Sequence, residues 1–446
     1  MEETKAGNEF EQMKPRLAEA KLGSFLIVPL KYDQSCRDFS WLRENAERQK
    51  LETMDLNELV KKMFNESDSI EVGACYQITK ETFIRELLGK KSAEISGFAA
   101  VEGMDSEINW ELMGFDVNCA YFYLFHTGIA FLCLGIRYSD MRTLRRIRNP
   151  GYAEESTAYY YLNKDGTYCR FSLSEQLTGL YRKAGMEMFF GNGKPLFLEA
   201  FTYNFAVVTQ RFEHMETMRR ITFNLHRMTD ICEQLEDDSE ADVRYVYAVK
   251  DQRARSYRWG CCASSQTLSY VVADPEQDIE TEMEAQAQDG MPMVLLALYE
   301  KYTCLHFTEL LSLVDKKKVK RIKSLKKMML EFQAYGMIHP ANISRWHNVK
   351  MIYQYLLETN ALQEAVEDVD RKISILNEHQ REIETARSET VMGVITVFGV
   401  VSILASVLSI IQILSGGNEL EWMVTILTSL TMVMIAVIAF MWERKK

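Results

Sequence analysis

The hydrophobic pattern of the chain changes abruptly near residue 390. Val391–Leu414 is an uncharged run of 24 residues, and Trp422–Trp442 is a second uncharged run of 21 residues. A helix rises ~1.5 Å per residue and a bilayer has a hydrocarbon core of ~30 Å, so about 20 apolar residues suffice to cross it. The two runs therefore predict two membrane-spanning helices at 391–414 and 422–442, joined by a short hairpin.

Apolar or neutral residues also recur at alternating steps of three and four upstream of the first run. The series is Ile352, Tyr355, Thr359, Leu362, Val366, Val369, Ile373, Leu376, Gln380, Ile383, Arg387 and Thr390, and it continues through Val394, Val397, Val401, Leu404, Leu408 and Ile411. This spacing is typical of a coiled-coil seam. It predicts one helix of about 105 Å that runs into the membrane as a self-associating stalk. An amphipathic helix packed on its own domain is the alternative.

Before residue 290 the pattern alternates between strands and helices. Two hairpins are predicted, 121–125 with 129–138 around His126-Thr127-Gly128, and 158–162 with 167–173 around Asn163-Lys164-Asp165-Gly166. Further strands are expected at 25–30, 197–209, 243–250, 257–262 and 267–272, helices at 38–65 and 211–236, and a polar segment without a defined element at 1–24. The fold class is therefore α+β, with a largely antiparallel sheet and helices.

The pattern divides the chain into three expected parts. Residues 1–290 are expected to form an α+β domain, 291–390 a helical stalk, and 391–446 a two-helix transmembrane domain. Within the second part, helices are predicted at 293–314 and 316–335 and end at Gly336 and Pro340. The acidic stretch 274–289 is expected to be a linker or a short helix.

The charges near the apolar runs predict an orientation. Arg387 precedes the first run and Arg444, Lys445 and Lys446 follow the second, whereas the hairpin carries Glu419 and Glu421 but no Lys or Arg. Positive charges that flank membrane helices stay in the cytoplasm. We therefore expect a multi-pass protein of the inner (plasma) membrane with both termini in the cytoplasm.

Composition narrows the partners and cofactors. The net charge of −11 disfavours direct binding to nucleic acid. Nine cysteines without a C-x-x-C pair indicate a reducing compartment and neither a zinc site nor a disulfide framework. The sequence has no Walker A motif, no dinucleotide-binding G-x-G-x-x-G and no H-E-x-x-H, and its seven histidines have no metal-ligand spacing. We therefore expect neither an enzyme nor a covalently bound cofactor.

The order of these parts, with Gly416-Gly417-Asn418 directly after the first run, resembles the CorA family of divalent-cation channels, the two-span GxN superfamily. The resemblance is best over 293–446, and the N-terminal domain matches only in class and order. It implies a homopentamer in which 391–446 form the pore domain, with the first span lining the pore, and 1–290 form a cytoplasmic sensor domain. The family tripeptide is usually Gly-Met-Asn after a Tyr, whereas this chain has Gly417 in the middle and Ser415 before it.

The resemblance assigns an ion filter to the hairpin. Asn418 would hold a hydrated cation at the pore mouth, and Gly416 and Gly417 would form the turn that presents it. Mg²⁺ retains much of its water, which suits a ring of amide carbonyls. Glu419 and Glu421 would raise the local cation concentration. The alternative is a simple polar turn. Mg²⁺ or another divalent cation is thus the expected transported or regulatory ion.

A polar stripe on the first span is one candidate pore lining. It consists of Thr396, Gly399, Ser402, Ser406, Ser409 and Gln412, at steps of three or four. Polar groups in a span face protein or water rather than lipid. The rival lining is the apolar seam from Val394 to Leu408, which would gate by dewetting. Close packing of the small residues against the second span is the third interpretation.

Two functions are consistent with this pattern. The first is an oligomeric CorA-like channel for divalent cations, gated by its cytoplasmic domain. The alternative is a membrane effector of a type III CRISPR-like antiviral defence system, opened by a nucleotide-derived messenger. Candidate ligand residues for the second are Arg253, Arg255, Tyr257, Arg258 and Trp259, although a hairpin with surface arginines explains them equally well. A membrane-tethered structural oligomer is a third hypothesis. Acidic stretches at 233–242 and 274–284 are candidate regulatory cation sites or solvated faces.

Overall fold

The computed structural model describes residues 2–33, 39–65, 72–102, 113–148, 157–191, 196–197, 199–233, 243–274, 276–312 and 319–414. The chain divides into two compact units. The first contains Met1–Leu313 and Ser324–Val369, and the second contains Val314–Lys323 and Asp370–Lys446. The three parts expected from the sequence stay a prediction.

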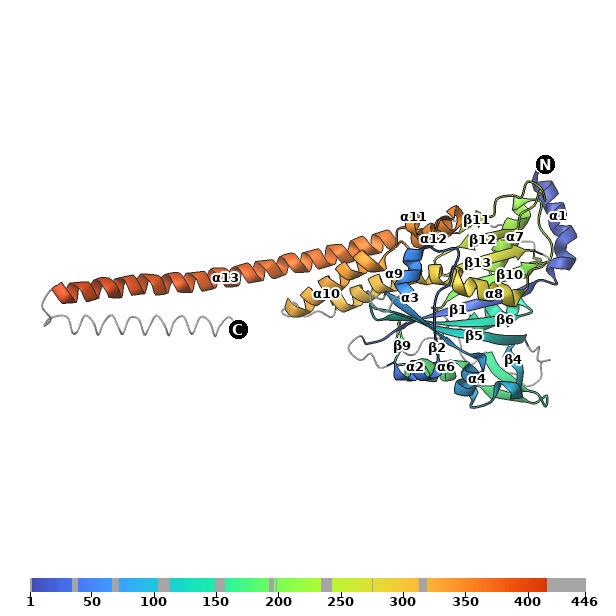
Figure 1. Cartoon of the computed structure of the whole chain (residues 1–446), viewed down its shortest axis with the longest axis horizontal. Coiled ribbons are helices and arrows are strands. Elements are labelled where there is room, and N and C mark those ends of the chain that lie inside the picture. The colour runs from blue at the N-terminus through green and yellow to red at the C-terminus, as the bar shows by residue number, and fades with distance from the viewer. Residues whose placement is uncertain are drawn as a thin grey trace. The chain divides into compact units, whose positions relative to one another are not determined.

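One large sheet organises the first unit (Figure 1). Its order is β11-β12-β13-β10-β1-β6-β5-β4-β7-β8, with β3 on β5, β2 on β3 and β9 on β1. The strands are β1 (Lys21–Lys31), β2 (Glu47–Gln49), β3 (Gly73–Ile78), β4 (Ile95–Glu102), β5 (Met113–Phe125), β6 (Ile129–Tyr138), β7 (Thr157–Asn163), β8 (Tyr168–Phe171), β9 (Glu187–Met188), β10 (Phe201–Val208), β11 (Arg244–Tyr247), β12 (Trp259–Ala263) and β13 (Thr267–Ala273). Among these described strands, β10 and β13 pair in parallel and the other pairs are antiparallel.

Strand β1 lies at the centre of the sheet and is buried on both faces. It pairs with β6 on one side and β10 on the other, and residues 22–30 are all buried. An antiparallel strand is buried on both faces only where other elements cover both. Leu26, Val28 and Leu30 belong to the main core cluster, whereas Phe25 packs edge-on against Phe205 on the opposite face.

Helices supply the cover on both faces. The core cluster unites one face of the sheet with α1 (Glu2–Leu17), α4 (Lys80–Leu88), α5 (Met141–Arg148), α6 (Leu173–Lys183) and α7 (Met215–His226). On the other face, α8 (Ile279–Gln288) contacts β1 and β10, and α9 (Gly290–Ser312) contacts β6. The short helices α2 (Ser40–Asn45), α3 (Glu58–Asn65) and η1 (Ser92–Glu94) lie between the strands in sequence.

Aromatic rings join α9 to the sheet. Tyr299 stacks on Phe125 with 4.2 Å between ring centroids, and Tyr302 meets Phe131 edge-on at 5.8 Å. Tyr299 and Phe125 have essentially no exposed surface. Aromatic pairs in these geometries add stability beyond the area they bury, so they fix α9 against the β5–β6 hairpin.

The C-terminal helices follow α9 in close succession. They are α10 (Val319–Glu331), the π-helical turn η3 (Phe332–Gly336), α11 (Pro340–Ile343), α12 (His347–Thr359) and α13 (Leu362–Leu414). Helix α13 has 53 residues and is therefore about 80 Å long. It continues without interruption from the first unit into the first apolar run.

The predicted sheet and both hairpins are confirmed, and the helix predicted at 211–236 is present in shorter form as α7, Met215–His226. Strands β5 and β6 pair across a turn with Gly128 at φ 89°, and β7 and β8 pair across a turn with Gly166 at φ 85°. Both backbone conformations favour glycine.

Two expectations about the first 65 residues are wrong. Residues 2–17 are not structureless but form α1, which buries Phe10, Met13 and Leu17. The expected helix at 38–65 is instead α2, β2 and α3, because β2 pairs with β3.

The predicted continuous helix from Ile352 is also interrupted. Ala361 adopts a left-handed conformation with φ 49°, and the Asn360 side chain caps α12 by donating to the Leu356 carbonyl at 2.7 Å. The heptad pattern therefore crosses a break between α12 and α13, and the uninterrupted helix begins at Leu362.

Candidate functional site

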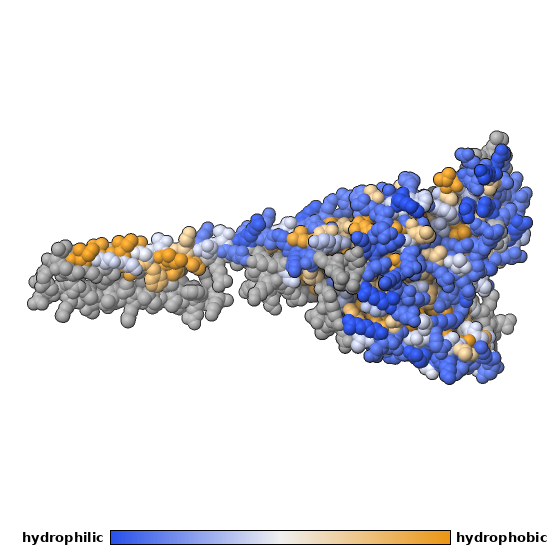
Figure 2. All heavy atoms as spheres, in the orientation of Figure 1, coloured by the Kyte–Doolittle hydropathy of each residue, from blue (hydrophilic) through white to orange (hydrophobic). Residues whose placement is uncertain are grey.

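The C-terminal half of α13 presents an apolar surface. Residues 384–403 form a helical segment long and apolar enough to cross a membrane, and none of it is buried within the chain. Met392, Ile395 and Ile403 each expose more than 60% of their side chains, and Val400 exposes 52%. Figure 2 shows hydrophobic residues gathered along this part of α13. A large apolar surface of this kind marks a contact with lipid or protein.

The predicted polar stripe lies on this same helix. Thr396, Gly399, Ser402 and Ser406 are exposed, and Ser409 and Gln412 continue the helix. The Thr396 hydroxyl donates to the Met392 carbonyl at 2.9 Å, and the Ser406 hydroxyl donates to the Ser402 carbonyl at 2.8 Å. Such bonds to the preceding turn satisfy a hydroxyl in an apolar environment. The assignment of this stripe to a pore stays a prediction.

The remaining predicted membrane residues lie outside the described residues. These are the filter residues Gly416, Gly417, Asn418, Glu419 and Glu421, together with the second apolar run at 422–442. Their roles rest on the sequence.

The arginine-rich hairpin is occupied by local contacts. Arg258 forms an ion pair with Asp274 at 3.0 Å, and Trp259 stacks on Tyr270 with 5.3 Å between ring centroids. Asp251 accepts from the backbone amides of Arg253 and Ala254, which forms a tight turn. Arg253, Arg255, Tyr257, Arg258 and Trp259 line neither of the two cavities described below, so their role in ligand binding also rests on the sequence.

The acidic stretch after β13 has structural partners. Asp278 caps α8 and pairs with Lys21 at 2.9 Å. Glu280 pairs with Arg137, and Glu282 accepts from Gln277 and Gln286. Among the residues that the structure describes, no group of three or more acidic, His or Cys side chains is arranged to hold a metal ion. A regulatory cation site here stays a prediction.

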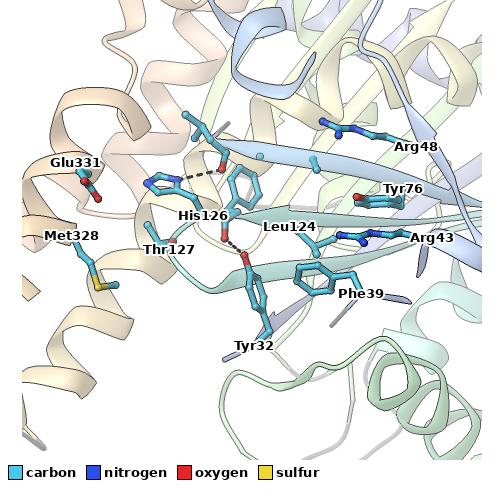
Figure 3. A pocket seen from close by; sticks show the side chains of 14 residues that line it. Tyr32, Phe39, Arg43, Arg48, Tyr76, Leu124, His126, Thr127, Met328 and Glu331 are labelled. Atoms are coloured by element: carbon cyan, nitrogen blue, oxygen red, sulfur yellow. Dashed lines mark hydrogen bonds between the residues drawn. The ribbon is translucent and has the colours of Figure 1, made fainter. Parts of the chain in front are cut away.

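A cavity of about 580 Å³ opens where α10 meets the edge of the sheet (Figure 3). Its wall comes from segments distant in sequence: the end of β1, α2, β2, β3, the β5–β6 turn and α10. Strand pairing explains the convergence, since β2 aligns Arg48 with Tyr76 of β3, and β3 aligns Tyr76 with Phe122 of β5. The cavity lies within the first unit.

The two ends of this cavity differ in chemistry. Figure 3 shows Arg43, Arg48, Tyr76 and Phe39 at one end. His126, Thr127, Met328 and Glu331 lie at the other end. The cavity therefore combines two guanidinium groups, several aromatic rings and one carboxylate.

Hydrogen bonds hold the cavity wall in place. The Tyr32 hydroxyl donates to the Phe125 carbonyl at 2.5 Å, and its ring meets Phe39 edge-on at 5.2 Å. The His126 ring nitrogen Nδ1 lies 3.3 Å from the Val72 carbonyl and 3.3 Å from the Tyr299 hydroxyl. These contacts connect the cavity to α9 through Tyr299.

A second cavity of about 500 Å³ lies between the end of α1, the start of α5 and the segment after α7. Its lining includes Asp140, Arg142 and Arg145 from one side and Asp230 and Glu233 from the other. Asp140 and Arg142 pair with each other at 2.6 Å. Its mixed charges point to no particular ligand.

One carboxyl is buried beside Tyr299. The Glu300 side chain on α9 exposes 2% of its surface, and its Oε1 accepts from the Tyr353 hydroxyl at 2.8 Å and the Ile338 amide at 3.3 Å. Burial raises the pKa of this carboxyl from 4.5 to about 7. Glu300 thus connects α9, the loop after η3, and α12. Sequence reasoning missed both this residue and the cavity arginines.

Comparison with known proteins assigns the chain to no family. No family model matches the chain, and no curated protein matches it.

Proposed function

We propose that this chain is a membrane protein in which several copies form a pathway for divalent cations, controlled by a large cytoplasmic α+β domain. The observation that carries the proposal is the apolar segment of α13, which no other described part of the chain covers. Water is an unfavourable environment for such a surface, and a bilayer is the environment that its length and composition fit.

The remainder of the proposal comes from the sequence. The second apolar run at 422–442 returns the chain across the bilayer, and basic residues at 444–446 keep that end in the cytoplasm. The segment from Gly416 to Glu421 then lies outside as the cation filter. The resemblance to CorA channels supports a homopentamer with Mg²⁺ as the ion. In this proposal the stalk is helix α13, which begins at Leu362 after the left-handed Ala361.

Ion flux through liposomes tests this proposal. The purified full chain, reconstituted with a Mg²⁺-sensitive dye inside the vesicles, is expected to admit Mg²⁺. Asn418→Ala is expected to reduce the rate at least about tenfold, because the pore mouth loses the amide carbonyls that accept from the ion's water shell. Asn377→Ala on α13, outside the apolar run, serves as the control and is expected to keep the wild-type rate.

Two results would count against the proposal at different levels. If the wild-type protein inserts but admits no divalent cation, it is not a channel of this kind. If Asn418→Ala conducts Mg²⁺ with unchanged rate and selectivity, the filter lies elsewhere.

The cavity beside α10 favours a second form of the function, a membrane effector that opens when a small ligand binds its cytoplasmic domain. In that form the protein alone is closed in liposomes and opens on addition of a ligand. Flux measured with and without candidate ligands separates it from a constitutively conducting channel.

A further inference from the structure

The arginine end of the cavity is suited to an anion. Arg43 on α2 and Arg48 on β2 both line it, and both side chains are exposed to the opening. Within the part of the chain that the structure describes, Arg43 has no ion-pair partner. Guanidinium groups bind phosphate and carboxylate through paired, charge-assisted hydrogen bonds.

The walls of the cavity are suited to a flat ring. Tyr32, Phe39 and Tyr76 line it as partly buried aromatic side chains, and Leu124 and Met328 add apolar surface. Aromatic faces and a methionine thioether pack well against planar heterocycles. The volume of about 580 Å³ falls within the ~300–1,000 Å³ that small-molecule sites occupy.

The far end of the cavity carries a hydrogen-bond acceptor. Glu331 on α10 lines it, with its carboxylate 3.6 Å from Lys327 of the same helix. A carboxylate in this place selects a ligand that has an amino group at the end opposite its anion. The cavity is therefore polar in a defined direction, with cations at one end and an acceptor at the other.

We propose that this cavity binds a nucleoside phosphate. The phosphate lies against Arg43 and Arg48, the base lies against Tyr32 and Leu124 between the two ends, and the exocyclic amine of the base donates to Glu331. This assignment moves the ligand site away from the hairpin at Arg253–Trp259. The proposed nucleotide binding can be tested separately from ion conduction, because a binding measurement needs no ion flux.

The position of the cavity gives binding a structural consequence. Met328 and Glu331 belong to α10, whereas the arginines belong to the sheet edge and α2. A bound ligand therefore connects α10 to the sheet. Because α10 is followed directly by the turn at Phe332, whose ring packs against Tyr299 at 5.5 Å, we expect bound ligand to slow local opening of α10.

Calorimetric titration of the detergent-solubilised full chain tests the assignment, with AMP, ATP, adenosine and inorganic phosphate as probes. AMP or ATP is expected to bind saturably, and adenosine and phosphate at least about tenfold more weakly. Arg43→Ala is expected to weaken nucleotide binding about 10- to 100-fold, since it removes a charge-assisted hydrogen bond. Arg253→Ala is the matched control and is expected to bind as the wild type does.

Hydrogen exchange supplies a readout that misfolding of a variant would not imitate. Nucleotide is expected to slow amide exchange in 325–332 of the wild type and not of Arg43→Ala, while the two proteins exchange alike without ligand. The proposal is overturned if neither AMP nor ATP binds, or if phosphate alone binds as tightly as AMP. It is also overturned if Arg253→Ala abolishes binding and Arg43→Ala does not, which would return the site to the hairpin.

Discussion

A chain that carries both Val400→Lys and Ile403→Lys is expected not to insert its first apolar run into the membrane. Both side chains are exposed on α13 within the apolar surface. A lysine at the centre of a spanning helix costs about 2.5–3.5 kcal/mol, so two cost about 5–7 kcal/mol. Because ~1.4 kcal/mol is a tenfold change in an equilibrium, insertion should fall by more than about a hundredfold.

An alkaline phosphatase reporter fused directly after Leu414 measures this insertion, because the enzyme is active only outside the cytoplasm. Full activity is expected from the wild-type fusion and background activity from the double variant. Ser374→Lys with Asn377→Lys has the same spacing on α13 outside the apolar run and should leave activity unchanged. Background activity from the wild-type fusion would show that the apolar surface of α13 does not cross the membrane.

Glu300→Gln is expected to stabilise the first unit by about 3 kcal/mol at pH 8 and by less than about 1 kcal/mol at pH 5. Burial raises the pKa of Glu300 from 4.5 to about 7. Between these values the folded state holds a proton that the unfolded state has released, so stability falls as pH rises through this window. At ~1.4 kcal/mol per pH unit, the loss approaches about 3 kcal/mol above pH 7. The neutral Gln avoids it and still accepts from Tyr353 and Ile338.

Denaturant unfolding of the full chain in detergent, followed by near-ultraviolet circular dichroism between pH 5 and pH 8, measures this difference. Glu358→Gln on α12 is the control, since Glu358 is exposed and bonded to Gln354. Its stability should follow the wild-type pH dependence. Parallel curves for Glu300→Gln and the wild type would mean that Glu300 ionises in the folded protein without cost.

The elements that could be predicted are those that local sequence determines. The turn Asn163–Gly166 specifies its hairpin through four residues, and the nearly continuous apolar run 129–138 is typical of a buried strand. Helix α1 is hard to recognise because its four buried residues, Ala6, Phe10, Met13 and Leu17, are dispersed among charged residues. The 38–65 segment was misassigned because β2 exists only through its pairing with β3, which is a long-range interaction. The break at Ala361 could not be predicted, because neither a proline nor a glycine lies next to it in the sequence.

The cavity could not be predicted for the same reason at a larger scale. Its lining residues range from Tyr32 to Glu331 in the sequence, and only the tertiary fold brings them together. Arg43 and Arg48 fall in a stretch whose pattern predicted an ordinary surface helix. By contrast, the hairpin at Arg253–Trp259 attracts attention in the sequence through its density of arginine and aromatic residues. In the fold, Arg258 and Trp259 are engaged by neighbouring residues of the sheet.

The central position of β1 has a consequence for how the protein is made. Its partners β6 and β10 lie about 100 and 175 residues further along the chain. At ~5–20 residues per second of translation, an 11-residue apolar strand waits about 10–35 s for its second neighbour. The nascent chain therefore needs protection from aggregation before either of the two C-terminal apolar runs, 391–414 and 422–442, leaves the ribosome. Slowing synthesis between residues 31 and 200 should lower the yield of folded protein more than slowing it after residue 300.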